Sequence, residues 1–366
     1  MLAGVWQKLK MERVAGNGLA ALAADWQALS AWAQEPGGFL TADFMLPILA
    51  QAKGVGIDCV GHDGRLLLAV PTVAGRGFDR VVTSDLTASN LPLVEGEQAQ
   101  EAVLAFINAR ERPCLFKSIP VDSNFYAQLQ ALAPRFQVLK RWQRAALKID
   151  GTFESWLAQN FDHKRRKEFK RLRNRLAEQG ELKLEILTQS SNLQNFLDNL
   201  LELEAKGWKG RRRTALQSQA GTANVFQQIC INLQTSGKLR FWQLKHDGKA
   251  IASLFGMVED DKAWIVKIAH DEAFAKFSPG VLLVLDATQC LFAEGGVKLV
   301  DSCAIPGHPM IDRIWRDRIA MADVLIAPAN VSRLHFKAVT LALSAHDKLR
   351  ETAKRIFYKL MKRKMS

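Results

Sequence analysis

Three neighbouring residues have the types and order of a phosphate-binding helix start. Ser278, Pro279 and Gly280 separate an extended segment, Ala263–His270, from an apolar helical segment, Pro279–Glu294. Ser suits a helix N-cap, Pro the first helical position, and Gly permits close backbone approach. The free N–H groups and about +0.5 of dipole charge at such a start can bind a phosphate. An ordinary capped helix start has the same pattern, so the motif alone does not distinguish a phosphate-binding site from a helix start without a ligand.

Two potential proton acceptors follow this helix. Asp301 ends the predicted strand Val297–Cys303, and His308 lies in the loop after it. Either side chain could remove the proton of an amine nucleophile or hold the amine in place. Lys267, on the preceding strand, could line the same site. The alternatives are a turn role for Asp301, an exposed loop position for His308 and a solvent-facing strand position for Lys267.

Positive charge is the main feature of the composition. The net charge is +13 and the pI is about 9.6, which favours an anionic partner: nucleic acid, a membrane surface or a phosphorylated cofactor. A dense basic helix contains Lys164, Arg165, Arg166, Lys167, Lys170, Arg171, Arg173 and Arg175. A solvated helix face explains such a run equally well. Trp208 and Lys209 precede three arginines and could form a wall for the acceptor, although a core tryptophan at a helix end is the alternative.

The cysteines and the apolar runs indicate in which cellular compartment the protein is expected. The five cysteines are odd in number, and no pair has the spacing of metal ligands, so we expect free thiols, no metal site and a reducing cytoplasm. No apolar run approaches the roughly 20 residues of a membrane span. The basic N-terminus and Gly18–Ala33 read as an amphipathic helix without a cleavage site.

The order of predicted elements is the same in both halves: helix, hairpin, strand, helix, strand, helix, strand. An Asp-Gly pair marks each hairpin, at Asp63-Gly64 and at Asp247-Gly248. In the second half, Thr152–Gln179 reads as one helical region, Met310–Arg318 as a helix and Asp323–Ala327 as the last strand. We therefore predict an α/β fold of two tandem mixed-sheet units flanked by helices, although two unrelated units could share this order. The predicted boundaries are 1–146, 147–331 and a basic helical tail, 332–366.

The second half also resembles a known family. The stretches concerned are Lys164–Arg175, Glu204–Lys209, Leu244–Ala252, Lys267–Asp271 with Phe277–Leu283, and Leu299–Asp301. Their order resembles the GNAT superfamily of N-acyltransferases, and more closely the BioF/CelD-type acetyltransferase-like domain, which is related to the Fem-type aminoacyl transferases. The resemblance covers most of Ile149–Ala327. It implies two GNAT-like units, of which the first is degenerate.

The resemblance implies a donor, an acceptor and a set of residues. The donor is acyl-CoA, and no metal is needed. The resemblance assigns the donor to Lys267, Ser278, Pro279, Gly280, Val281 and Leu282, the acceptor to Trp208 and Lys209, and catalysis to Asp301 or His308. The helix start departs from the usual GNAT loop, having one Gly and a Pro. This departure leaves open the Fem-type alternative, in which aminoacyl-tRNA is the donor.

The predicted function is therefore transfer of an acyl group from acyl-CoA to an amine, on a lipid of the sphingoid type or an amino sugar. The alternatives are Fem-like aminoacyl transfer, with tRNA as the nucleic-acid partner, and a degenerate GNAT pair that only binds. The tail Lys348–Lys364 has an apolar stripe with eight cations around it. It reads as a helix that docks on an anionic membrane from the cytoplasm, or that packs on the core.

Overall fold

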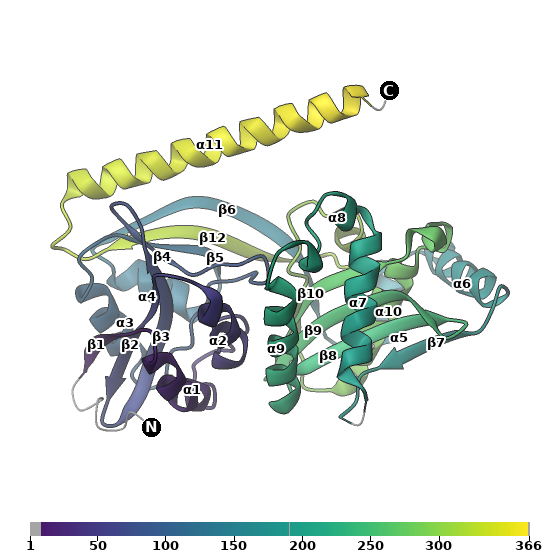
Figure 1. The fold of residues 1–366 in the computed structure, drawn as a ribbon, viewed down its shortest axis with the longest axis horizontal. Helices are drawn as coiled ribbons and strands as arrows, with labels where there is room; N and C mark the ends of the chain where they lie inside the picture. Colours follow the sequence, from purple (N-terminus) through teal and green to yellow (C-terminus); the bar gives the residue numbers. More distant parts are fainter. Residues whose placement is uncertain (1–8, 190, 365–366) are drawn as a thin grey trace.

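A computed structural model describes the backbone of residues 9–189 and 191–364. These residues form one mixed sheet of 12 strands, in the order β1-β2-β3-β4-β5-β12-β6-β11-β10-β9-β8-β7. Helices cover both faces of the sheet, and the last helix lies apart from the rest (Figure 1). The predicted α/β fold class is thus confirmed.

The first half supplies six strands and four helices of the described chain. They are β1 (Lys10–Val14), α1 (Gly18–Leu29), α2 (Ala42–Gln51), β2 (Val55–His62), β3 (Arg65–Ala74), β4 (Asp79–Val81), α3 (Ala99–Asn108), β5 (Cys114–Pro120), α4 (Asn124–Leu132) and β6 (Arg135–Lys148).

The second half repeats this plan with extra helices. Its elements are α5 (Phe153–Asn160), α6 (His163–Ala177), β7 (Leu182–Ile186), α7 (Leu193–Lys206), α8 (Trp208–Arg211), α9 (Thr222–Thr235), β8 (Leu239–His246), β9 (Lys249–Glu259), β10 (Lys262–His270), α10 (Pro279–Glu294), β11 (Leu299–Asp301), β12 (Asp317–Ala327) and α11 (Arg333–Lys364). Short 3₁₀ turns, η1 (Leu216–Ser218), η2 (Glu272–Phe277) and η3 (Ile311–Arg313), connect some of them.

The two units exchange their last strands. β12 pairs antiparallel with both β5 and β6, while β6 also pairs antiparallel with β11. Within each unit, one short pair is parallel, β4 with β5 and β10 with β11. Counted inward from either edge of the sheet, antiparallel strands come first, a parallel pair follows, and the strand exchanged from the other unit comes next. The two halves of the sheet therefore have the same order of pairs. This symmetry supports the predicted repeat.

Both predicted hairpin turns are present. Asp63 and Gly64 have φ of 48° and 77°, and Asp247 and Gly248 have φ of 46° and 75°. Positive φ at both central residues is the type I′ geometry that favours Asp-Gly, because its twist matches that of the flanking strands. The turns set the registers of β2 with β3 and of β8 with β9.

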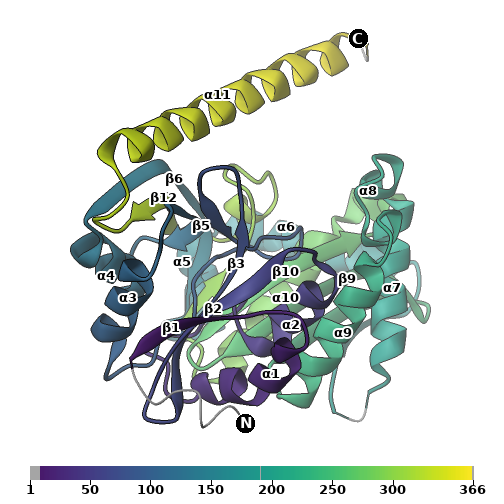
Figure 2. The same ribbon diagram turned by 60° about the vertical axis from the view of Figure 1, so that its left-hand side comes forward.

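The end of β10 lies between two layers of helices, one on each face of the sheet. α7 and α9 pack on one face of β8–β10 and share a core with the first half. α5, α6 and α10 pack on the other face around a second core. Figure 2 shows α7 and α9 in front of this part of the sheet.

Three predicted elements differ from the structure. β1 is a strand paired with β2, where no strand was expected. The basic region Thr152–Gln179 is two helices, because the chain is extended at Phe161 before Asp162 caps α6. Met310–Arg318 is not a helix: one 3₁₀ turn precedes β12, which begins at Asp317 and pairs along its whole length with β6.

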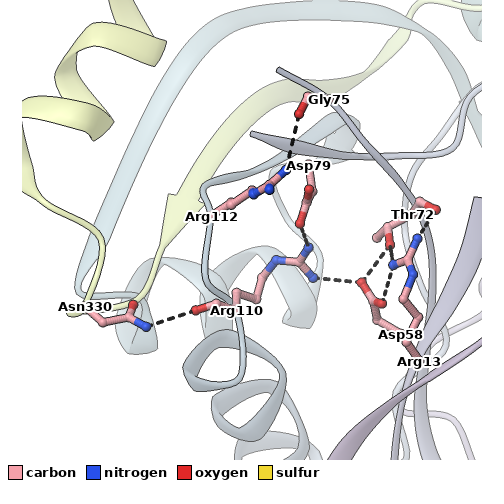
Figure 3. A network of polar contacts seen from close by, with 8 residues as sticks. All are labelled: Arg13, Asp58, Thr72, Gly75, Asp79, Arg110, Arg112 and Asn330. Atoms are coloured by element: carbon pink, nitrogen blue, oxygen red, sulfur yellow. Dashed lines mark hydrogen bonds and ion pairs between the residues drawn. The ribbon is translucent and has the colours of Figure 1, made fainter. Parts of the chain in front are cut away.

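A largely buried charge network joins the strands of the first unit to the segment after α3 (Figure 3). The Arg110 guanidinium donates to Asp58 Oδ2 at 2.9 Å and to Asp79 Oδ2 at 2.5 Å. Arg13 donates to the other Asp58 oxygen at 2.7 Å and to the Thr72 hydroxyl at 2.7 Å. These bonds satisfy charges that would otherwise be costly to bury.

The tail helix α11 packs on the sheet only near its start. Phe336, Val339 and Leu343 join a small cluster with Leu115 and Leu325. The rest of the helix extends away from the body in both views (Figures 1 and 2), with Leu349 71% exposed. In the described part of the chain, no helix is long and apolar enough to span a membrane.

Candidate active site

The site begins where two parallel strands separate. β10 and β11 are paired only from Lys262 with Leu299 to Trp264 with Asp301. β11 then ends, while β10 continues to His270. On its other side, β10 shifts register against β9 between Ile265 and Lys267, so Val266 has no partner on either neighbour.

A cavity of about 600 Å³ opens between the diverging strand ends. Its lining is mainly apolar and comes from α7, α8, β10, η2, α10 and the loop after β11. The residues are Leu203, Glu204, Gly207, Trp208, Lys209, Ile265, Val266, Lys267, Ile268, Ala269, His270, Glu272, Val284, Ser302, Cys303, Ala304, Ile305, His308, Pro309, Met310 and Ile311. The predicted residues Trp208, Lys209, Lys267 and His308 therefore lie around one cavity.

Glu204 organises one wall of the cavity. It is buried, and it accepts hydrogen bonds from Lys209 Nζ at 2.6 Å and from the Leu216 backbone N–H at 2.8 Å. Burial lowers the pKa of the Lys267 ammonium, and the Glu204 carboxylate acts in the opposite direction. Asp85, from the first half, also acts on Lys267. The wall is polar, and Glu204 and Lys209 form an ion pair within it.

His270 ends β10 inside the cavity. Burial lowers the pKa of its imidazole below the ordinary value of 6.5, against the nearby carboxylates Glu272 and Asp271. The ring makes no hydrogen bond within the described residues, and its Nδ1 would lie 3.3 Å from a Cβ placed on Gly280. At neutral pH, His270 is thus an uncharged ring that is free to accept a proton.

His308 has a fixed tautomer. Its Nδ1 accepts from the backbone N–H groups of Met310 and Ile311, each at 3.4 Å. Burial lowers the pKa of this ring as well, with Asp312 opposing the effect. An accepting Nδ1 leaves the proton of the neutral ring on Nε2, which makes His308 a hydrogen-bond donor to its surroundings.

Asp301 lies behind the cavity, where Arg144 of β6 binds its carboxylate. The two side chains are 1% and 4% exposed. The other Asp301 oxygen accepts from the backbone N–H of Cys303 at 2.9 Å, and Cys303 has φ of 53°. Asp301 therefore holds the turn that lines the cavity, and its catalytic role stays a prediction.

The start of α10 lies next to the cavity. Pro279 occupies the first turn as predicted, but Ser278 has a left-handed conformation and its side chain makes no cap hydrogen bond. A Cβ on Gly280 would meet His270 at 3.3 Å and Met310 at 3.5 Å, so these two side chains pack closely against the helix start. The predicted donor residues Ser278, Pro279, Gly280, Val281 and Leu282 do not line the cavity, and Val284 is the α10 residue in its lining.

Sequence reasoning did not single out Glu204 and His270 as site residues. Both lie within stretches that carry the family resemblance, at the end of a helix and at the end of a strand. One signal in the sequence could have identified His270. It is a titratable residue at the last position of the strand that precedes the Ser-Pro-Gly helix start. Among the described residues, no group of His, Cys, Asp and Glu could hold a metal ion.

Comparison with known proteins agrees with this geometry. The family described as acetyltransferase (GNAT) domain matches residues 163–307. No curated protein matches the chain significantly by sequence. Three solved structures have a similar fold. FemX is 11% identical, with a TM-score of 0.57, 87% of this chain covered and 98% of FemX.

The other two are equally distant in sequence. The C-terminal domain of a protein described as a lysylphosphatidylglycerol synthetase from Agrobacterium fabrum is 13% identical, with a TM-score of 0.55 and coverage of 89% and 95%. A conserved protein of unknown function from Bacteroides thetaiotaomicron is 14% identical, with a TM-score of 0.52 and coverage of 87% and 100%. Residues 163–307 thus match a GNAT acetyltransferase domain, and the chain as a whole has a fold similar to that of FemX.

Proposed function

We propose that the protein transfers an acyl group from acyl-CoA to an amine acceptor, with both substrates bound together. The observation that carries the proposal is the cavity between the diverging ends of β10 and β11, which His270 lines while its ring lies against Gly280 at the start of α10. A thioester supplies an acyl group already activated for attack by an amine.

Two features of the chain support a CoA thioester as the donor. Pro279 and Gly280 begin α10 beside His270, and the positive end of the helix dipole favours a phosphate at this helix start. Val266 lines the cavity at the register shift of β10, and in the proposal its backbone N–H donates to the acyl carbonyl oxygen.

The two histidines have complementary roles in the proposal. His270 takes the proton that the amine loses as its nitrogen bonds to the acyl carbon, and can return it to the departing thiolate. His308 donates from Nε2 and polarises or positions the reacting group. Preorganised donors of this kind in a largely apolar cavity are worth about 10²-fold or more in rate.

The acceptor side favours an amphiphilic amine. Trp208 and Ile305 line the cavity, and they are 51% and 72% exposed. The Arg212 guanidinium lies 5.5 Å from the centre of the Trp208 ring. A lipid of the sphingoid type fits this partly apolar opening, and an amino sugar stacked on the tryptophan is the other acceptor we consider.

Aminoacyl transfer from tRNA is the second candidate, because the whole chain has the fold of FemX. The two candidates differ in the donor. Acetyl- and long-chain acyl-CoA should release free thiol in the presence of a sphingoid amine or an amino sugar. Transfer of radiolabelled amino acid from aminoacyl-tRNA, without thiol release from acyl-CoA, would replace our proposal with the second candidate.

The site of action in our proposal is the inner face of an anionic membrane. Support comes from α11, whose distal part extends from the body and whose sequence is rich in Lys and Arg. Clusters of basic residues are attracted to anionic lipid by about 1 kcal/mol per charge near the surface.

A further inference from the structure

A second cavity lies on the opposite side of α10 from the active-site cavity. It has a volume of about 650 Å³ and is enclosed by α5, α6 and α10. Its apolar floor consists of Phe153, Leu157, Phe169, Leu282 and Leu285. Neither the acyl-transfer chemistry nor the packing of the sheet requires this groove to be open.

One wall of the groove is a stripe of cations on α6. Arg166, Lys167, Lys170 and Arg173 share this side of the helix, facing Leu285 and Asp286 on α10. Arg173 is paired with Asp286. In the described part of the chain, Arg166, Lys167 and Lys170 form no ion pair, and the Arg166 Nε is buried without an acceptor. Among the described residues, the groove therefore presents three cations without an ion-pair partner beside an apolar surface, and Lys167 and Lys170 are exposed to water. Glu154 and Asp286 are the carboxylates in its lining.

The aromatic rings of the floor are already engaged by the protein. Phe153 stacks on Trp156 with ring centres 5.7 Å apart. The Arg165 guanidinium lies 4.9 Å from the centre of the Phe169 ring, and Phe161 packs against that ring edge-on. Single-stranded nucleic acids are held by bases stacked on free aromatic faces. Engaged rings and leucines favour an aliphatic chain instead.

We propose that this groove binds one anionic phospholipid. The headgroup phosphate lies against Arg166, Lys167 and Lys170, and an acyl chain lies along the leucine floor. Charge-assisted hydrogen bonds from Arg and Lys suit a phosphate, and each methylene placed on the floor adds to affinity. The site is separate from the proposed acyl-transfer cavity, so it would hold a lipid whether or not the enzyme acts on one.

The test uses soluble, monomeric lipid, so that adsorption of α11 to a bilayer plays no part. Binding of dihexanoyl phosphatidic acid to the full chain is measured by calorimetry, beside dibutanoyl phosphatidic acid, dihexanoyl phosphatidylcholine and inorganic phosphate. We expect the dihexanoyl acid to bind roughly tenfold more tightly than the dibutanoyl acid if one chain enters the groove. Phosphatidylcholine and phosphate should bind far more weakly.

The variant pair separates the groove from general charge. Lys167→Glu with Lys170→Glu should weaken lipid binding at least tenfold. Lys164→Glu with Arg175→Glu makes the same charge change at exposed α6 positions outside the groove, and should leave binding within twofold. Melting curves check that both variants fold.

Three results would overturn the proposal. Equal weakening in both variants would show non-specific attraction. Inorganic phosphate binding as tightly as the lipid would show a simple anion site. Loss of tRNA binding in the groove variant, with lipid binding intact, would assign these cations to a nucleic acid.

Discussion

Replacing Asp301 with Asn tests whether this buried carboxylate stabilises the fold or carries the chemistry. Asn keeps the size of the side chain and an oxygen for the Cys303 N–H, but it leaves the Arg144 guanidinium without its counter-charge. Arg144 is 4% exposed, so water cannot compensate. Removing one partner of a buried ion pair costs about 3–5 kcal/mol. An unfolding entropy of about 2.1 cal/mol/K per residue gives about 0.8 kcal/mol/K for 366 residues. A loss of about 4 kcal/mol therefore lowers Tm by about 5 °C if the chain unfolds as one unit.

The assay follows Tm by circular dichroism and acyl transfer by thiol release, on the same preparations. Asp261→Asn is the control, because Asp261 pairs with Lys298 on the surface and should cost less than about 1 kcal/mol. A second variant, Arg144→Met with Asp301→Leu, removes both charges and should recover most of the stability. If Asp301→Asn melts like the parent but loses activity, the carboxylate is catalytic and the structural reasoning fails.

Four further outcomes are expected. Gly280→Glu should raise the Kd for acyl-CoA about 10²-fold or more, since it places bulk and negative charge at the helix start; unchanged affinity in a folded variant would remove the donor site from α10. His270→Ala should lower kcat about 10²-fold. Because burial lowers the pKa of His270 below 6.5, the parent should lose activity only as pH falls below 6.5, and the variant should lack this acid limb; a limb that persists would identify another base. Arg110→Met should cost about 3 kcal/mol in urea unfolding, because it leaves the Asp79 carboxylate without its counter-charge and Asp58 with Arg13 alone. Removing Lys348–Ser366 should release the protein from anionic vesicles without changing Tm; earlier melting of a protein that never bound vesicles would mean that α11 belongs to the core.

The elements that the sequence predicted well have local signals at both ends. The bounds of α10 agree with the prediction, because Pro279 is well suited to the first helical position and Gly295, with φ of 73°, ends the helix. The two Asp-Gly turns fix their hairpins through the same local preference for positive φ. Such signals need no knowledge of the rest of the chain.

The errors arise where distant pairing overrides local pattern. Residues 310–318 have helical periodicity, but β12 begins at Asp317 because it pairs with β6 from Ala146 onward. β1 has no strong strand pattern and forms along the exposed edge of β2, where the Arg13 side chain reaches Asp58. β12 and β6 are far apart in the sequence, and so are β1 and β2. The pattern of residues within a short stretch of the chain therefore cannot reveal either pairing.

The site was predictable in its parts but not in its assembly. Lys267 and His308 were predicted to lie near one site and both line one cavity, because strand, helix and loop follow one another in the chain. The partner of Asp301 could not be found in this way, since Arg144 comes from β6 of the first half. Similarly, only the fold reveals that Nδ1 of His308 is occupied while His270 is free.

The strand exchange makes the first half part of the site. β6 lies between β12 and β11, so Arg144 reaches the end of β11 and holds Asp301, which in turn holds the turn at Cys303. Asp85, also from the first half, influences the charge state of Lys267 in the cavity. A fragment that begins after β6 would expose the edges of β11 and β12 and would lose both interactions. The first unit therefore supports the candidate site of the second, although its own sequence carries none of the motifs of the family.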